Sequence, residues 1–249
     1  MLKFSYKIYH YVQVFFLRLM SWISANKIDT FDYDKILIIS PHPDDEVFGC
    51  GGLIHSLTQD GKQIDIIILS EGEAVHRHCC PGDEEYIVSN RKRLTEEANK
   101  ILGLETLHIH RMKFPDGNFF SAKNDKQLIQ LLENKIQELN PSTVFIPHPY
   151  EYSPDHMAAT EIASNILNKL HISYYYYCVW TWYHMPIYKI FQLSYKKSIL
   201  LKVNNQIAKN KAIDIYTKNS AKCGISFSGD LPKPFIYAFR WKYELFFKS

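Results

Sequence analysis

The chain has 249 residues, of which 46% are hydrophobic, and this length is sufficient for one sizeable α/β domain. Its 29 basic and 26 acidic residues give a net charge of +3 without any block of like charge, so nucleic acid is not indicated as a partner. The five scattered cysteines include no CxxC pair, which argues against a disulfide scaffold and favours a reducing compartment.

Residues 4–23 carry apolar side chains at helical spacing, and the charges among them are all basic. Gln13 and Arg18 interrupt the apolar run, which makes it a poor transmembrane span and a poor signal peptide. We therefore expect residues 1–33 to form an amphipathic helical extension of one domain at 34–249, in a cytoplasmic protein. Two interpretations stay open for the helix: packing on the body of the protein, or peripheral contact with the inner face of an anionic membrane.

Strand-like and helix-like stretches alternate after residue 34. This pattern predicts an α/β fold with a Rossmann-like, mostly parallel sheet and helices on both faces. The expected strands are 35–40, 63–70, 105–110, 143–147, 174–180 and 199–203, and the expected helices are 47–61, 86–102, 124–139, 155–170 and 205–221. Ligands bind beyond the carboxyl ends of such strands, so the segments after the first and fourth strands should share one functional edge.

The segment HPDDE, residues 42–46, directly follows the first expected strand. Acidic side chains this close repel one another and resist burial unless a cation holds them, and imidazole and carboxylate groups are good zinc ligands. His42 and Asp45 can turn toward one ion from a loop that enters a helix. Of Asp44 and Asp45, one can ligate the metal while the other acts as a general base toward metal-bound water. Glu46 opens the helix, where an acid suits the helix dipole.

A third protein ligand is required, and His156 is the best candidate because it also lies at a helix start after a strand. His148 is the rival. A second set of possible ligands, His76, His78 and the adjacent Cys79 and Cys80, occurs in AVHRHCCPGD. For that segment we expect a mobile substrate loop, because loops at this edge shape the pocket.

The aromatic stretch YYYYCVWTWYHMP covers residues 174–186. Aromatic faces can stack on sugar rings, and aromatic side chains also fill protein cores. We expect most of these residues to pack in the core and under the N-terminal helix, with sugar stacking as the alternative.

PHPDDE, followed by a glycine-rich helix start and a later PDH, resembles the LmbE-like or PIG-L family of zinc-dependent N-deacetylases over about residues 34–220. The resemblance implies a hydrolase that acts on N-acetylglucosamine-type amino sugars. By position, it implies that His42, Asp45 and His156 bind Zn²⁺ or another divalent metal and that Asp44 is the general base.

The resemblance also implies that Arg91 and Asp116 contact the sugar. Each residue has a simpler interpretation. Arg91 belongs to the run RKR and could be a surface residue, and Asp116-Gly117 is a typical turn sequence.

The chain departs from the family pattern at Ser153, where relatives carry a histidine that stabilises the oxyanion, and at Leu94, where they carry an acid. Ser-Pro-Asp suits a helix N-terminus, so Ser153 is expected to cap the helix. His148, Tyr150 or Tyr152 could supply the missing hydrogen-bond donor.

Three hypotheses follow for the function. The first is deacetylation of a glycan precursor, a nucleotide sugar or a glycoside. The second is a weak or inactive relative that binds metal and glycan, and the third is an amidase of another amide, such as a thiol conjugate.

Overall fold

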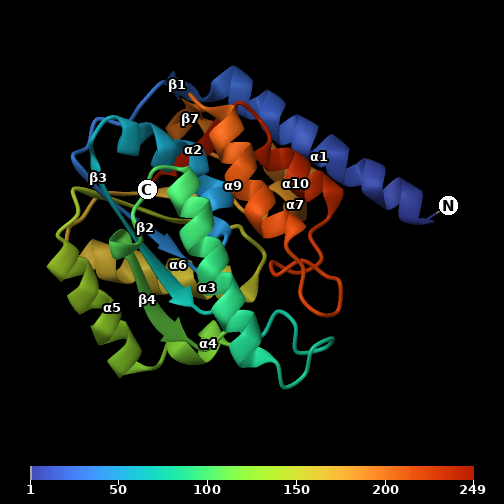
Figure 1. Cartoon of the computed structure of the whole chain (residues 1–249). Coiled ribbons are helices and arrows are strands. Elements are labelled where there is room, and N and C mark those ends of the chain that lie inside the picture. The colour runs from blue at the N-terminus through green and yellow to red at the C-terminus, as the bar shows by residue number, and fades with distance from the viewer. Residues whose placement is uncertain (1) are drawn as a thin grey trace.

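The computed structural model describes the backbone of residues 2–249 and the side chains of residues 8–249. Eight strands form one sheet in the order β1-β7-β8-β6-β5-β2-β3-β4. Figure 1 labels β1, β2, β3, β4 and β7 of this sheet. The strands are β1 (Asn26–Ile28), β2 (Lys35–Ser40), β3 (Gln63–Ser70), β4 (Ile109–Phe114), β5 (Thr143–Pro147), β6 (Tyr174–Tyr177), β7 (Ser198–Lys202) and β8 (Tyr243–Lys248). Only β8 runs antiparallel to its neighbours, so the expected mostly parallel sheet is confirmed.

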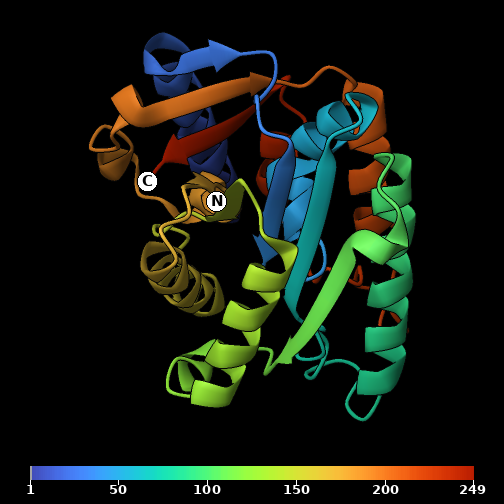
Figure 2. The same ribbon diagram turned by 90° about the vertical axis from the view of Figure 1, so that its left-hand side faces the viewer.

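Helices cover both faces of this sheet (Figure 2). The longer ones are α1 (Leu2–Ser24), α2 (Asp45–Gln59), α3 (Glu84–Ile101), α5 (Lys126–Leu139), α6 (Pro154–Lys169) and α9 (Gln206–Lys218). The short ones are α4 (Phe119–Ala122), α7 (Thr181–His184), α8 (Ile187–Ile190), α10 (Lys233–Phe239) and the 3₁₀ turns η1 (Thr106–His108) and η2 (Tyr195–Lys197).

Strand β2 shows why both faces need a cover. Successive side chains of a strand point to opposite faces, and all of its apolar residues are buried. Ile36 and Ile38 join the core under α2, α3 and α9, whereas Leu37 and Ile39 join the core under α5 and α6. The apolar run before HPDDE therefore fixes a central strand, and the end of that strand delivers the polar segment to the sheet edge.

The close packing of α2 on the sheet requires a glycine at position 49. A Cβ atom there would lie 2.3 Å from Cδ2 of the Tyr177 ring. Tyr177 is fully buried, and its hydroxyl donates a hydrogen bond to the carbonyl of Ile39, just before HPDDE. The glycine at the start of α2 thus lets the helix approach strands β6 and β2 closely.

Two sequence predictions of strands need correction. The strand expected at 105–110 is wrong, because 106–108 form the turn η1 and β4 begins at Ile109; Met112 and Phe114 of β4 are the side chains that pack in the core. The strand expected at 174–180 ends at Tyr177, because the next backbone amides donate to the Glu151 side chain instead of a neighbouring strand. Strands β1 and β8 were not expected at all.

The helix expected at 4–23 is α1, and it packs on α7, α8, α10 and β7. Val14 and Leu17 are fully buried, and the Gln13 side chain donates to the carbonyl of Met185. The opposite side of α1 exposes large apolar side chains, among them Phe15 and Ile23. The basic side chains of Lys3 and Lys7 lie outside the described residues. No helix in the described part of the chain is long and apolar enough to cross a membrane.

Candidate active site

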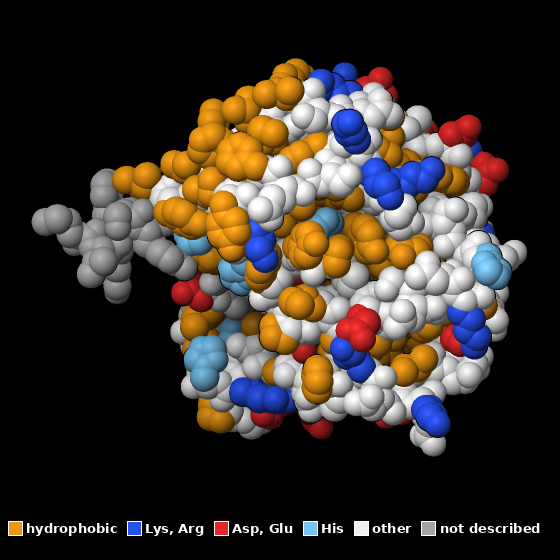
Figure 3. Space-filling view, turned by 180° about the vertical axis from the view of Figure 1, so that it is seen from behind, with side chains coloured by type: hydrophobic (Ala, Val, Ile, Leu, Met, Phe, Trp, Pro, Cys, Tyr) orange, Lys and Arg blue, Asp and Glu red, His pale blue; other side chains and the backbone are white. Residues whose placement is uncertain are grey.

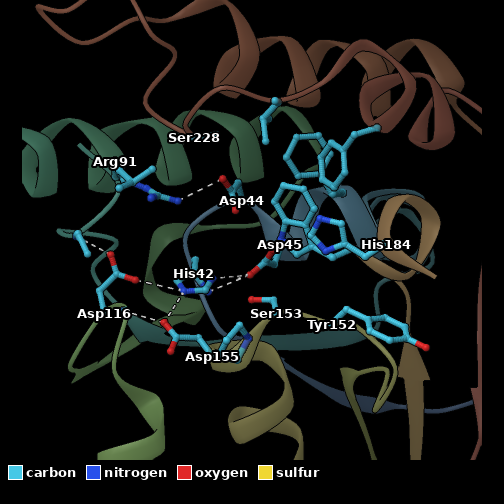
Figure 4. A pocket seen from close by; sticks show the side chains of 18 residues that line it. His42, Asp44, Asp45, Arg91, Asp116, Tyr152, Ser153, Asp155, His184 and Ser228 are labelled. Atoms are coloured by element: carbon cyan, nitrogen blue, oxygen red, sulfur yellow. Dashed lines mark hydrogen bonds and ion pairs between the residues drawn. The ribbon is translucent and has the colours of Figure 1, made fainter. Parts of the chain in front are cut away.

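The loops after β2, β3, β4 and β5 meet at one edge of the sheet around a cavity of about 460 Å³. This volume suits a small-molecule ligand. The lining includes His42, Asp44, Asp45, Phe48, Ala74, Val75, Arg91, Asp116, Gly117, Tyr152, Ser153, Asp155, Trp180, His184, Ser228, Leu231 and Phe235 (Figure 4). The HPDDE segment and the segment after the fourth predicted strand therefore do share the functional edge.

The structure brings His42, Asp45 and His156 together. Asp45 Oδ2 lies 3.2 Å from His42 Nδ1 and 3.2 Å from His156 Nε2, and one ligand atom of each residue lies within 4.8 Å of the others. Both ring nitrogens of His156 are buried, and their contacts with the Asp45 and Glu151 carboxylates lack hydrogen-bond geometry. A buried imidazole held between two carboxylates fits a divalent metal ligand.

Glu151 orients the His156 ring from behind. The Glu151 side chain is fully buried, and one of its oxygens lies 3.3 Å from His156 Nδ1. Its carboxylate accepts hydrogen bonds from the backbone amides of Val179, Trp180 and Thr181 and from the Thr181 hydroxyl. A carboxylate held this way fixes the ring so that Nε2 faces Asp45, as outer partners of metal-binding histidines do.

Asp116 and Asp155 bracket His42 on the other side. His42 Nε2 lies 3.2 Å from Asp116 Oδ1 and 3.4 Å from Asp155 Oδ2. The Asp155 carboxylate also accepts hydrogen bonds from the amides of Gly117 and Phe119, which ties the turn after β4 to the start of α6. Sequence reasoning assigned no role to Asp155; its place directly before His156 in the PDH motif was the available signal.

This concentration of carboxylates shifts the protonation of the histidines toward the charged form. Burial lowers the pKa of His156, but Asp45 and Glu151 outweigh it and raise the pKa to about 9. Burial is likewise outweighed at His42 by Asp116, Asp155 and Asp45, and its pKa is raised well above the usual value. The site therefore attracts positive charge, which either protons or a metal ion can supply.

Asp44 points away from Asp45 and toward Arg91 (Figure 4). Its backbone has a φ of 126°, which is strained for a residue with a side chain and is typical of functional positions. The Asp44 amide donates to Glu46 Oε2 at 2.9 Å, and this buried acid helps to hold the strained backbone. Burial raises the pKa of Asp44 to about 7, although Arg91 opposes the increase.

Arg91 is buried against the site, so the interpretation of Arg91 as a surface residue is wrong. Its guanidinium lies 3.1 Å from Asp44 Oδ2 and donates to the carbonyls of Pro43 and Gly72. Gly72 has a φ of +73°, and a Cβ there would lie 2.4 Å from Arg91 Nη1. The glycine thus makes room for the guanidinium.

Ser153 lines the cavity at the N-cap of α6, where the sequence places it, but its side chain makes no capping hydrogen bond. The rival ligand His148 lies apart from the clusters of possible metal ligands found among the described residues, and its Nδ1 accepts from the Tyr150 amide. Burial lowers the pKa of His148 to about 4. Neither His148 nor Tyr150 belongs to the described cavity lining, whereas Tyr152 and His184 do.

The aromatic stretch divides between core and cavity. Tyr174, Tyr175, Tyr177 and Trp182 are buried in the core, as expected. Trp180 and His184 instead line the cavity and stack on each other with ring centroids 5.0 Å apart. Nothing in the sequence distinguishes His184 from its aromatic neighbours.

A family model described as PIG-L, GlcNAc-PI de-N-acetylase, matches residues 37–167. The chain belongs to the PIG-L family. The matched stretch holds HPDDE, Arg91, Asp116 and the PDH motif, so the resemblance drawn from these motifs is confirmed.

Curated relatives of this PIG-L chain carry deacetylase names. It is 30% identical over 135 residues to a probable N-acetyl-alpha-D-glucosaminyl L-malate deacetylase 2 of Bacillus anthracis. This alignment covers 53% of the chain and 58% of that protein. It is 31% identical over 136 residues to a diacetylchitobiose deacetylase of Thermococcus kodakarensis, which covers 51% of the chain and 47% of that protein. The matched stretch thus spans about half the length of these relatives.

Solved structures support the PIG-L fold. The N,N'-diacetylchitobiose deacetylase of Pyrococcus horikoshii has a TM-score of 0.63 and 19% identity, and the alignment covers 88% of this chain and 84% of that one. At this identity the likeness establishes the fold alone. Any statement about activity therefore rests on the geometry of the site.

Proposed function

We propose that the chain is a metal-dependent hydrolase that removes the acetyl group from an N-acetylglucosamine-type amino sugar. The observation that carries the proposal is the meeting of His42 and Asp45, which line the cavity, with the buried His156, beside Asp44. Pure metal binding needs no further acid, whereas hydrolysis of an amide needs a base next to the metal. The deacetylase names of the family and of the relatives support the same reaction.

His42, Asp45 and His156 would hold the metal, for which we propose Zn²⁺ because two imidazoles and one carboxylate leave a fourth position open. Bound there, zinc would polarise the acetyl carbonyl and lower the pKa of water. Asp44 accepts the proton of the attacking water at its carboxylate and returns it to the leaving amine. Arg91 holds the Asp44 carboxylate in place through the 3.1 Å contact.

Groups that line the same wall of the cavity position the substrate. Asp116 faces the cavity from the turn after β4, and its other oxygen accepts from the Ala74 amide at 2.5 Å. We propose that Asp116 accepts hydrogen bonds from sugar hydroxyls and that the Trp180 ring stacks on the sugar. Arg91 contributes through its remaining guanidinium hydrogens.

We propose that His184 supplies the hydrogen bond to the acetyl oxygen that the family's histidine provides at the Ser153 position. His184 lines the cavity from α7 on the side of Asp45 (Figure 4). Replacing His184 with alanine should lower kcat by about 10²–10³-fold, the usual cost of losing an oxyanion donor. The matched control is His148→Ala, a buried histidine outside the described cavity lining; equal losses in both variants would exclude the proposed role.

The decisive experiment measures acetate release by the zinc-loaded protein from free N-acetylglucosamine, nucleotide sugars and lipid-linked forms. We expect release from at least one class, with release reduced by about 10²–10⁴-fold in the Asp44→Asn variant and absent from the metal-free protein. Zinc binding without release from any member would overturn the proposal. It would favour a metal- and glycan-binding relative or an amidase of another amide, such as a thiol conjugate.

We further propose that the substrate is amphiphilic and that α1 rests on an anionic membrane surface. The exposed apolar side chains of α1 gather on one face of the molecule (Figure 3), and those of α8 and the following residue lie against α1. The set comprises Ile8, Tyr9, Tyr11, Val12, Phe15, Leu19, Trp22, Ile23, Tyr188 and Phe191. Lys27 and Lys242 lie over the Trp22 ring, which places basic groups at the border of this surface.

The exposed apolar face of α1 lies next to the wall of the cavity. The His10 ring of α1 stacks on Tyr183 of α7 at 3.8 Å, and α7 also carries His184. Sedimentation with vesicles tests the idea. The protein should sediment with vesicles containing phosphatidylserine, and the Phe15→Ser/Ile23→Ser variant should sediment less. Absence of sedimentation would exclude the membrane proposal. It would leave the deacetylase proposal, which the acetate assay tests, unaffected.

A further inference from the structure

A second group of metal-binding side chains lies outside the described cavity lining. His76, Cys79 and Cys80 come from the loop after β3, and Cys223 comes from the loop after α9. We call these four residues the cysteine cluster. One ligand atom of each lies within 4.8 Å of the others, although Cys223 is 147 residues from His76 in the sequence.

The distances among the ligand atoms of His76, Cys79 and Cys223 are compatible with a tetrahedral site. Cys79 Sγ lies 3.3 Å from His76 Nδ1 and 2.8 Å from Cys223 Sγ, and Cys223 Sγ lies 3.7 Å from His76 Nδ1. Zinc–sulfur bonds of about 2.3 Å place the ligand atoms of a tetrahedral site about 3.8 Å apart. Shifts of about 1 Å or less in these contacts would therefore accommodate the ion.

The local backbone presents the side chains together. The amides of Cys79 and Cys80 both donate to the carbonyl of His76, at 3.0 and 2.8 Å, and this single turn carries three of the ligands. Cys223 sits in a second turn, where the Gly224 amide donates to the Ala221 carbonyl at 2.9 Å. His76 and Cys80 are buried, while Cys79 and Cys223 are partly exposed, which leaves an entry path for an ion.

We infer that the cysteine cluster is a structural zinc site, separate from the one at His42. Three thiolates and one imidazole form a closed Cys₃His ligand set, which is characteristic of structural zinc and leaves no position for a substrate. This inference stands independently of the deacetylase proposal, because none of the four residues belongs to the described cavity lining.

The zinc would join two loops that form one wall of the cavity. Ala74 and Val75 line it from the first loop, and Ser228 and Leu231 line it from the second. The loops already touch, since a Cβ at Gly229 would lie 3.2 Å from Cγ2 of Val75. A metal bond between them fixes the wall opposite the α6 start, and its loss should raise KM for a sugar substrate more than it lowers kcat.

Metal content of the full chain tests the inference. In a His42→Ala/His156→Ala variant, purified under reducing conditions after growth with zinc, we expect one zinc ion per chain to remain. The same variant loaded with Co²⁺ should show a thiolate-to-cobalt charge-transfer absorption, which the His42 site cannot produce because it has no thiolate. Adding Cys79→Ser and Cys223→Ser should remove both the metal and the absorption.

The matched control adds Cys50→Ala and Cys178→Ala, two cysteines outside the cluster, and should leave the metal content and the absorption unchanged. If the Cys79→Ser/Cys223→Ser protein does not fold, the cobalt spectrum of the chain with all five cysteines still decides. Absence of both zinc and the charge-transfer band from that protein would overturn the inference, including the case in which Cys79 and Cys223 are found joined as a disulfide.

Discussion

Two groups of buried charges flank helix α2, and they differ in how completely they are neutralised. Behind the helix, Lys209 Nζ lies 2.6 Å from Glu244 Oε1, and the Glu244 carboxylate also accepts from the amides of Gly52 and Leu53. Both side chains are almost fully buried. This pair is closed, because each charge has its opposite and both carboxylate oxygens accept hydrogen bonds.

The group at the start of α2 is open. Asp45, Asp116 and Asp155 contact His42, and Asp44 next to them contacts the fixed cation Arg91. A closed pair stabilises one structure, whereas an open group retains affinity for a further cation. The comparison indicates that the edge with the candidate active site is distinguished by an excess of buried negative charge, whereas a buried charge alone occurs elsewhere in the molecule as well.

The largest expected effect comes from Asp44→Asn, which removes the base but no proposed ligand. Activity should fall by about 10²–10⁴-fold, the usual contribution of a general base. Metal content should be unchanged, and kcat and metal content measured on the same preparation would show this. Asp45→Asn is the matched control and should lose the metal as well; loss of metal from Asp44→Asn would instead make Asp44 a ligand.

Lys209→Met opens the closed pair and should lower the free energy of unfolding by about 3–5 kcal/mol, because it leaves Glu244 buried without a counter-charge. Denaturant titration measures this. At a temperature where the variant is folded, kcat should match that of the unmodified chain. Adding Glu244→Gln should recover part of the stability; a lower stability in the double variant would contradict the charge argument.

Glu151 belongs to both kinds of group. Its carboxylate accepts hydrogen bonds from the backbone at 179–181 and also contacts His156, and Glu151→Gln tests the second contact. Metal affinity should fall by about 10–100-fold, as for other outer partners of metal ligands. Competition with a chromophoric chelator measures this affinity. An unchanged affinity with reduced thermal stability would assign Glu151 a purely structural role.

The smallest effect concerns Asp65, a buried acid on β3 that contacts His108 Nδ1 and His110 Nε2 at 3.1 Å each. Burial raises the pKa of Asp65, but hydrogen bonds from the two histidines outweigh it and the net pKa is lowered. The stabilisation is therefore present above the unfolded-state pKa of about 3.9 and is lost as the pH falls through the folded-state pKa.

Asp65→Asn should accordingly cost about 1 kcal/mol of unfolding free energy at pH 7, and less as the pH falls below about 4. Urea titrations of both proteins across this pH range measure the difference. A gap that widens in acid would mean that Asp65 binds its proton more tightly in the folded state.

The central strands could be predicted from the sequence because the apolar runs of β2, β3 and β5 are buried on both faces. These three strands match their predicted bounds at every residue. Strand β8 escaped prediction because its sequence, YELFFK, follows the last predicted helix and pairs antiparallel between two strands that precede it. The bounds of β4 were misjudged because it begins Ile109-His110-Arg111, and the polar side chains of His110 and Arg111 contact Asp65 and Glu71.

At the site, local motifs identified His42, Asp45 and His156, which the structure brings together, while their roles stay a prediction. The motifs could not reveal His184 of α7 and Cys223 of the loop after α9, because each meets the site or the cysteine cluster only through the fold. The mobility expected for the loop at 74–83 stays a prediction. His78 was a possible ligand beside His76, Cys79 and Cys80, although a mobile substrate loop was expected there; in the structure Cys223, and not His78, joins the other three.

The position of β8 bears on how the chain is made. This strand lies between β6 and β7, so β7 and β1 have no strand linking them to the rest of the sheet until the ribosome has translated Lys248. A nascent chain that stops before residue 243 could still assemble β2 to β6 with the HPDDE segment in place. It would then present β6, with its four consecutive tyrosines, as an unpaired edge that favours aggregation.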